Sequence, residues 1–283
     1  MSQLIQMRQR IKAIETIKKV TQAMRIISMS THTRLKRKVE NVEKYQQEII
    51  SLFSLVKNMF PKWTNPFLQQ KTKKSKDNNL IIVIASQKGL AGTFNSNLFK
   101  FFSSNEPTEK CDSITVGKKA NNFISKTKHT QIKTYPSLTT PLVQIITDEI
   151  FEIIMQTSPA YTNVTVYANI SRGFFSQKPQ TYQLIPFDAQ AEKLPEIDPD
   201  DYMWEEKPEN ILNFLASSYL KTVISQLLYQ SLLAEHAARF ISMDSATQSA
   251  ENMLTDMTLS YNKIRQAKIT RELTNLSASF QMD

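Results

Sequence analysis

The sequence predicts an α/β protein with two long terminal helices that pair as an antiparallel coiled coil, and with a compact α/β domain between them. Three observations predict this fold. Glycine and proline are confined to the middle of the chain, both ends carry apolar residues at helical spacing, and the middle alternates β-branched runs with helical patterns. The 283 residues, 41% hydrophobic and 22% charged, suffice for one or two domains with a buried core.

The distribution of helix breakers sets the domain boundaries. Neither glycine nor proline occurs in residues 1–60 or 209–283, although the chain has four glycines and eleven prolines. In a helix interior these residues cost about 1 and about 3 kcal/mol. We therefore predict coiled-coil helices over 1–60 and 209–283, a polar connector over 61–77 and an α/β domain over 78–195. A helix as long as the last segment would extend on the order of 110 Å and needs something to pack against.

Both terminal segments carry an apolar stripe of the kind that forms a coiled-coil seam. An antiparallel pair needs a connection at one end only, which the central domain can supply. The seam weakens over Ser28–Thr33 and is rich in Ala and Ser in the last segment, so it buries little area at about 25 cal/mol per Å². We hypothesise that surrounding protein supports the pair. The seam positions are Leu4, Met7, Ile11, Ile14, Met24, Leu35, Val39, Val42, Ile49, Leu52 and Val56, then Leu212, Leu215, Tyr219, Ile224, Leu227, Ala234, Ala238, Ile241, Met253, Met257 and Ile264.

The middle segment alternates predicted strands and helices, which favours βαβ units and a mainly parallel sheet. The predicted strands are Leu80–Ala85, Ile114–Val116 and Val164–Ile170, with an edge strand at Tyr182–Ile185. Helical patterns lie around Asn97–Phe102, Lys119–Ser125 and Leu142–Met155.

The turn Ser86–Asn95 (SQKGLAGTFN) follows the first predicted strand, where doubly wound sheets bind nucleotide phosphates. It matches neither phosphate-binding glycine motif, so we favour a tight turn with positive φ over a nucleotide site. The histidines His32, His129 and His236 lack metal-ligand spacing, and the single Cys111 excludes an intramolecular disulfide. We expect no catalytic site, no cofactor and no metal.

The net charge of +9 is concentrated at the N-terminus. Residues 1–57 contain 12 Lys/Arg and 4 Asp/Glu, whereas residues 205–283 contain 7 and 9. A basic helix can be a solvated face, a face toward an acidic protein, or a nucleic-acid or membrane-surface patch. A basic coiled-coil protein that binds nucleic acid is therefore the alternative function. No apolar run reaches about 18 residues, so no transmembrane helix is predicted.

Three segments resemble ATP synthase gamma subunits. The run Ser231–Leu276 resembles the family's C-terminal signature, with YN, RQA, IT and EL in register, and Arg10–Lys38 resembles its opening helix. The turn SQKGLAGTFN resembles the family's SDRGLCGxxN. The signature matches are Glu235, His236, Ala238, Arg239, Met243, Asp244, Ala246, Thr247, Ala250, Tyr261, Asn262, Arg265, Gln266, Ala267, Ile269, Thr270, Glu272 and Leu273.

The resemblance implies a non-catalytic rotary shaft that couples ion-driven rotation to ATP synthesis or hydrolysis. The antiparallel coiled coil would pass through a hexamer of alpha and beta subunits, with a Rossmann-like domain at its base beside the epsilon subunit and the membrane rotor c-ring. It also implies that Arg265 and Gln266 make polar contacts with a beta subunit, that Lys88 lies near a beta-subunit carboxylate, and that Met24 meets the beta-subunit lever. The protein would then be peripheral to the cytoplasmic side of the cell membrane, without nucleic acid as a partner and without membrane insertion.

Some residues depart from the family pattern. Gln87 and Ala91 replace the usual Asp and Cys of the turn, and Ile26–Ser30 replaces a stretch that is usually rich in alanine. These departures concern details of the turn and of the shaft contacts. Because the chain begins directly on the first helix, we expect a bacterial rather than an organellar origin. The sequence leaves open whether protons or sodium ions drive rotation, and in which direction the enzyme works.

Overall fold

The structure is a computed structural model that describes residues 2–60, 63, 78–157, 161–186 and 205–280. The predicted connector 61–77 lies outside the described residues except for Trp63, as does the end of the predicted α/β domain at 187–195. The described helices and strands are, in order, α1 (Ser2–Met59), β1 (Asn79–Ile84), α2 (Phe94–Ser104), β2 (Asp112–Val116), α3 (Lys118–Ile124), β3 (Thr130–Tyr135), α4 (Leu142–Gln156), β4 (Asn163–Gly173), β5 (Ser176–Ile185) and α5 (Pro208–Phe280).

The two long helices are present and uninterrupted. The helix α1 has 58 residues and α5 has 73 residues. Pro208 occupies the first position of α5, where its missing N–H is not needed and its fixed φ suits a helix. The prediction of an α/β fold with long terminal helices is confirmed.

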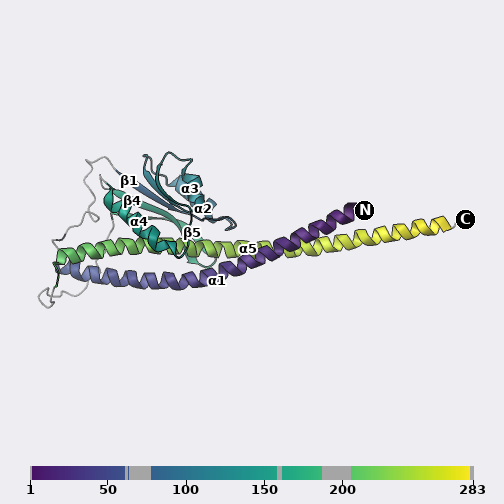
Figure 1. Ribbon diagram of the computed structural model, residues 1–283, viewed down its shortest axis with the longest axis horizontal. Coiled ribbons are helices and arrows are strands. Elements are labelled where there is room, and N and C mark those ends of the chain that lie inside the picture. Colours follow the sequence, from purple (N-terminus) through teal and green to yellow (C-terminus); the bar gives the residue numbers. More distant parts are fainter. Residues whose placement is uncertain (1, 61–62, 64–77, 158–160, 187–204, 281–283) are drawn as a thin grey trace. The chain divides into compact units, whose positions relative to one another are not determined.

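The chain forms two compact units, and α1 and α5 contribute to both. We call Met1–Met29 together with Arg239–Asp283 the terminal unit, and Ser30–Ala238 the sheet unit. The ribbon in Figure 1 shows the two helices in purple to blue and in green to yellow.

The sheet unit contains a five-stranded sheet in the order β3-β2-β1-β4-β5. The first four strands are parallel, and β5 is an antiparallel edge strand, so the prediction of a mainly parallel sheet is confirmed. The strand β3 was not predicted, because most of its side chains are exposed and it carries no apolar run. The edge strand β5 begins at Ser176, earlier than the predicted Tyr182, since its first half is also largely polar.

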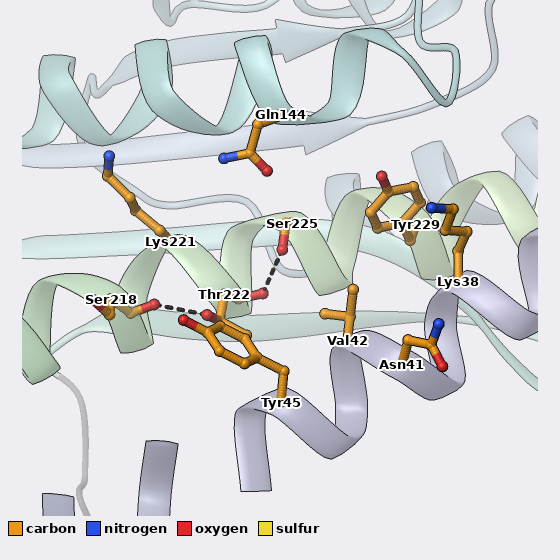
Figure 2. Close-up of a pocket in the computed structure, with 10 residues that line it drawn as sticks. All are labelled: Lys38, Asn41, Val42, Tyr45, Gln144, Ser218, Lys221, Thr222, Ser225 and Tyr229. Atoms are coloured by element: carbon orange, nitrogen blue, oxygen red, sulfur yellow. Dashed lines mark hydrogen bonds between the residues drawn. The ribbon is translucent and has the colours of Figure 1, made fainter. Parts of the chain in front are cut away.

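Alternate residues of the central strands face two separate apolar cores. On one face, Ile81 and Val83 pack with the helices α2 and α3 through Leu98, Phe102 and Ile124. On the other face, the core combines strand residues with residues from α4, α1 and α5, and α4 lies between the sheet and α5 (Figures 1 and 2). Within the sheet unit, α1 and α5 are therefore held by direct apolar contact with the core.

The coiled-coil seam follows the predicted stripe with two exceptions. Leu52 and Met253, which we expected on the seam, are 49% and 57% exposed. Conversely, Ser28 and His32 are buried within the stretch where the seam was expected to weaken. The Ser28 hydroxyl and the His32 imidazole occupy buried positions there. The helix therefore continues through this stretch, although its apolar stripe is interrupted.

Candidate functional site

The terminal unit buries little apolar surface. Among its described residues, only two apolar side chains are buried, Met243 at 3% exposure and Ala250 at 4%. The buried polar residues Thr21, Ser28 and Thr247 lie in the same unit. Because apolar burial is the main favourable term in folding, this pair of helices gains little stability from its own interior.

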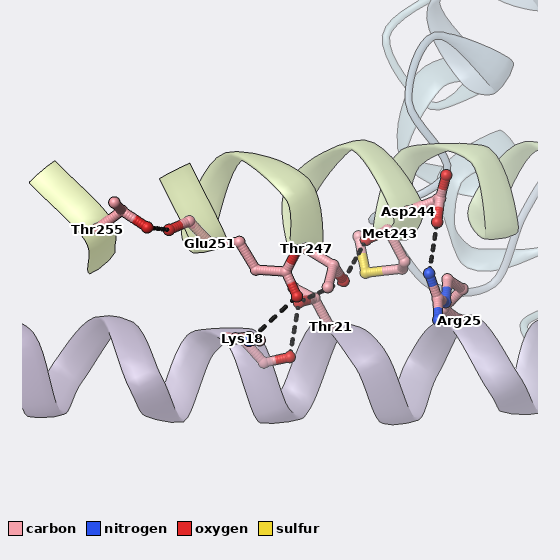
Figure 3. A network of polar contacts seen from close by, with 8 residues as sticks. All are labelled: Lys18, Thr21, Arg25, Met243, Asp244, Thr247, Glu251 and Thr255. Atoms are coloured by element: carbon pink, nitrogen blue, oxygen red, sulfur yellow. Dashed lines mark hydrogen bonds and ion pairs between the residues drawn. The ribbon is translucent and has the colours of Figure 1, made fainter. Parts of the chain in front are cut away.

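Polar contacts join α1 to α5 in this unit (Figure 3). They lie on successive turns of the two antiparallel helices, and the outer contacts are seven positions apart on each helix. We call these contacts the polar ladder, and its members are Lys18 with Glu251, Thr21 with Thr247, and Arg25 with Asp244.

Two rungs of the polar ladder are ion pairs. Lys18 Nζ lies 3.0 Å from Glu251 Oε1, and Arg25 Nη1 lies 2.6 Å from Asp244 Oδ1. The four side chains are 33% to 52% exposed, so water screens both pairs. Exposed pairs of this kind contribute about 0–1 kcal/mol each to stability. We infer that they fix the register between the two helices and add little to stability.

The middle rung is buried. Thr247 Oγ1 lies 2.9 Å from Thr21 Oγ1 and 2.7 Å from the Met243 carbonyl oxygen. Thr21 Oγ1 also lies 3.0 Å from the Lys18 carbonyl oxygen. Each hydroxyl has one hydrogen, so two hydrogens serve three acceptors. The bond between the helices can therefore form in either direction, provided that one helix gives up a bond to its own backbone.

The terminal unit also exposes large apolar side chains. Ile26 and Ile27, which depart from the family's alanine-rich pattern, are 60% and 62% exposed. Large apolar side chains that face solvent together are typical of surfaces that contact another protein. Those of the terminal unit are Ile5, Ile17, Val20, Ile26, Ile27, Met29, Met253, Leu259, Ile269 and Leu273.

The four residues that the sequence singled out lie in both units. Arg265 and Gln266 are exposed neighbours on α5 in the terminal unit, and Met24 is half-buried on α1 in the same unit. Lys88 is exposed in the glycine turn of the sheet unit. The side chains of Arg265, Gln266 and Lys88 form no hydrogen bond or ion pair within the described residues, so their polar groups are available to a partner.

The glycine turn after β1 adopts a left-handed conformation, as expected. Gly92 has φ 54°, but the second such residue is Leu90 with φ 65°. A left-handed residue other than glycine is strained by about 1–2 kcal/mol. Hydrogen bonds hold the turn against this strain: Ser86 Oγ donates to the Lys88 carbonyl at 2.7 Å, and Asn95 Nδ2 donates to Ser86 Oγ at 2.8 Å.

The end of the turn packs against α5 within the sheet unit. Ala91 and Phe94 form a small apolar cluster with Ala234 and Ala238 of α5. Asn169 Nδ2 of β4 donates to the Phe94 carbonyl at 2.8 Å. In a sheet of this order the crevice between β1 and β4 is where a nucleotide would bind. Here the turn uses that place to attach the sheet to a helix, which disfavours a nucleotide-dependent enzyme.

The buried histidines have structural surroundings. The Cys111 N–H donates to His129 Nδ1 at 3.2 Å, and burial lowers the His129 pKa although Glu106 opposes this shift. The His32 ring contacts Phe174 edge-on with centroids 4.8 Å apart, and burial followed by Lys36 lowers the His32 pKa. Across the described chain, no group of three or more His, Cys, Asp or Glu side chains is placed to hold a metal ion.

Sequence reasoning did not identify the polar ladder, although the sequence carries a signal for it. Basic residues at 18 and 25 flank a threonine, and acidic residues at 244 and 251 flank another, with identical spacing. Read in opposite directions, the two segments place each basic residue opposite an acidic one and threonine opposite threonine, although the steps between contacts are three and four positions on α1 and four and three on α5. Pairing them required only the assumption of an antiparallel coiled coil in a fixed register.

Comparisons with known proteins match nearly the whole chain. The family described as ATP synthase matches residues 3–281. The ATP synthase gamma chain of Rickettsia bellii is 29% identical, and the match covers 98% of this chain and 98% of that one. The ATP synthase gamma chain of Symbiobacterium thermophilum is 28% identical, and the match covers 94% of this chain and 93% of that one.

Solved structures share the fold. A chain from the central stalk and c-ring of Tetrahymena thermophila mitochondrial ATP synthase has a TM-score of 0.57 at 18% identity, covering 80% of this chain and 99% of that one. A chain from Euglena gracilis mitochondrial ATP synthase has a TM-score of 0.57 at 16% identity, and the match covers 89% of this chain and 94% of that one. No described helix is long and apolar enough to cross a membrane.

Proposed function

The chain belongs to the ATP synthase gamma-chain family, and from this premise we propose how its two units perform the work of a rotary shaft. A gamma chain is a non-catalytic stalk subunit, which couples rotation to ATP synthesis or hydrolysis carried out elsewhere in the complex. Its function therefore depends on contact surfaces rather than on an active site.

We propose that the terminal unit turns inside the hexamer of alpha and beta subunits. The observation that carries this proposal is the shortage of buried apolar side chains in this unit beside a large set of exposed ones. A helix pair of this kind gains stability when surrounding protein covers its exposed apolar residues. The polar ladder keeps α1 and α5 in register, so that torque applied to one helix reaches the other.

The individual contacts follow from the family resemblance and from side-chain exposure. Arg265 and Gln266 are placed to form polar contacts with one beta subunit, and Lys88 to approach a beta-subunit carboxylate. Met24, which is half-buried, offers an apolar contact to the moving lever of the same subunit. An exposed guanidinium suits a carboxylate partner because it can form two parallel hydrogen bonds.

Coupling requires that the shaft contact three catalytic sites differently. A ligand or subunit shifts a conformational equilibrium only by its difference in contact free energy with the two states. Polar contacts at Arg265 and Gln266 would define preferred angular positions. The exposed apolar side chains would permit slip between them, since apolar contacts are not directional.

The sheet unit carries the remaining contacts of the shaft in this proposal. It would contact the epsilon subunit and the membrane rotor c-ring, which places the protein at the cytoplasmic side of the membrane as a peripheral subunit. The attachment of the glycine turn to Ala234 and Ala238 supports this role, because torque from the sheet unit must pass into α5.

Reconstitution tests the proposal. The full chain is mixed with alpha and beta subunits from the same source, and assembly and ATPase activity are measured. We expect one copy per three alpha–beta pairs and activity only when the chain is present. Absence of a complex with a folded chain would contradict the proposal, and salt-dependent binding of nucleic acid would then be measured.

The contact residues are tested in the same assay. Arg265→Ala should lower ATPase activity or assembly, whereas Arg37→Ala removes an exposed arginine from the sheet unit and serves as the matched control. Unchanged activity and assembly with Arg265→Ala would show that this residue does not have the assigned role.

A further inference from the structure

We propose that a polar cleft in the sheet unit binds a small hydroxylated phosphate, such as a sugar phosphate. This site goes beyond the shaft role and does not depend on it. The cleft lies among α1, α4 and α5 and has a volume of about 460 Å³ (Figure 2). Pockets for small molecules span about 300–1,000 Å³, so the cleft is large enough for one such ligand.

The positive charge at the cleft favours an anion. Lys221 Nζ lies 2.8 Å from Asp148 Oδ1 and 4.9 Å from the centre of the Phe151 ring, so its ammonium is held in place. Lys38, on α1, is exposed and has no ion-pair partner among the described residues. The Asp148 carboxylate therefore balances the Lys221 ammonium, and Lys38 is left to pair with an incoming negative charge.

The hydroxyl groups on α5 favour a ligand that can donate hydrogen bonds. Thr222 Oγ1 donates to the Ser218 carbonyl at 2.7 Å, and Ser225 Oγ donates to the Thr222 carbonyl at 2.9 Å (Figure 2). Both side chains are buried, at 5% and 8% exposure, and both line the cleft. Since their hydrogens serve the helix backbone, their remaining lone pairs can only accept hydrogen bonds from a ligand.

A phenol adds a donor near the free ammonium. Tyr229 lies at the same end of the cleft as Lys38 in Figure 2 and is half-buried. Burial raises the Tyr229 pKa, so the phenol stays protonated at neutral pH and can donate to an anionic oxygen. One end of the cleft thus offers donors to a phosphoryl group.

The arrangement distinguishes a small ligand from an acidic segment of another protein. A carboxylate side chain would use Lys38 and Tyr229 but would leave the lone pairs of Thr222 and Ser225 without donors. A sugar phosphate can pair with the donors and with the acceptors at once. Its phosphoryl group would lie at Lys38 and Tyr229, and its hydroxyls would donate to Thr222 and Ser225. The recessed position among three helices also suits a compact ligand.

Calorimetric titration of the full chain tests the site with three probes: glucose 6-phosphate, inorganic phosphate and glucose. We expect glucose 6-phosphate to bind more tightly than inorganic phosphate, and glucose to show no measurable binding. Lys38→Ala should weaken glucose 6-phosphate binding by about tenfold or more, because one charge-assisted contact is lost. Lys44→Ala, on the same helix but outside the cleft, should leave the affinity unchanged.

A second variant tests the α5 hydroxyls. Thr222→Val removes an acceptor with little change in shape and should reduce the preference for glucose 6-phosphate over inorganic phosphate. No binding of glucose 6-phosphate at millimolar concentration would overturn the proposal, as would equal weakening by Lys38→Ala and Lys44→Ala. Binding of polyglutamate without binding of glucose 6-phosphate would assign the cleft to an acidic protein segment and overturn it too.

Discussion

The two units use the same pair of helices in different ways. In the sheet unit, α1 and α5 contribute Leu35, Val39, Ile224 and Leu228 to a core shared with the sheet and α4. In the terminal unit the described part of the same helices buries only Met243 and Ala250 as apolar side chains. The comparison shows that a continuous helix can pass from a region stabilised by its own core to a region that needs a partner.

The energies of the two regions differ accordingly. A fully buried Leu or Ile side chain contributes about 1.5–3 kcal/mol, and the sheet unit contains many of them. The terminal unit relies on half-buried seam residues and on the polar ladder, whose exposed ion pairs contribute about 0–1 kcal/mol each. The polar ladder therefore fixes the register of the helices in the terminal unit but contributes little to its stability.

The largest predicted contrast concerns apolar truncations. Leu98→Ala, at a fully buried position of the sheet unit, should lower the free energy of unfolding by about 2–5 kcal/mol. Ile14→Ala, at a half-buried seam position, should lower it by about 1 kcal/mol or less. Urea unfolding of both variants, followed by circular dichroism, checks this. Equal losses would contradict the contrast between the units.

The buried threonine rung should show strong coupling. Thr247→Val removes the hydrogen bond across the helix pair, while the Thr21 hydroxyl can still donate to the Lys18 carbonyl, so the variant should cost about 0.5–1.5 kcal/mol. The double variant Thr21→Val with Thr247→Val should cost less than the sum of the two single variants, because both single variants remove the same hydrogen bond between the helices. Amide hydrogen exchange over residues 243–257 measures both. Additive losses would contradict the shared hydrogen bond.

A pH effect on stability is expected from His129 in the sheet unit. Burial lowers the folded-state pKa of His129, so the unfolded chain binds a proton more readily. This contribution to stability is complete above the unfolded pKa of about 6.5 and is lost as pH falls below it, toward the lower folded pKa. Comparing urea midpoints of the wild type and His129→Asn across pH 5–8 isolates the effect. A smaller pH dependence in the wild type than in the variant would be inconsistent with it.

The smallest effect is predicted for an ion-pair rung. Arg25→Ala should cost about 0–1 kcal/mol, and added salt should shrink the difference from the wild type. Hydrogen exchange in the terminal unit at low and high salt measures this. A loss as large as that of Thr247→Val, or one that salt does not change, would mean that the ion pair contributes to the stability of the terminal unit as well as to its register.

Most of the fold could be predicted because its signals are local. The absence of glycine and proline predicted α1 and α5, and the β-branched run at Leu80–Ala85 predicted the central strand. The strand β3 escaped prediction, because an exposed edge strand such as Thr130–Tyr135 needs no apolar side chains. Its position depends on backbone pairing with β2, which a single sequence does not reveal.

The site was harder to predict, because it depends on how distant segments pack together rather than on local sequence signals. Exposure of Leu52 and Met253 depends on the exact phase of each helix, which small shifts in a weak seam can change. The left-handed Leu90 could not be anticipated, since glycine rather than leucine is expected there. The contact roles of Arg265, Gln266, Lys88 and Met24 still rest on resemblance, and the reconstitution assay addresses them.

The most direct test of the account is amide hydrogen exchange on the free chain and on the chain reconstituted with alpha and beta subunits. We predict fast exchange over the terminal unit in the free chain and strong protection in the complex, with little change in the strands of the sheet unit. Equal protection of the terminal unit in both samples would contradict the claim that this unit depends on surrounding protein.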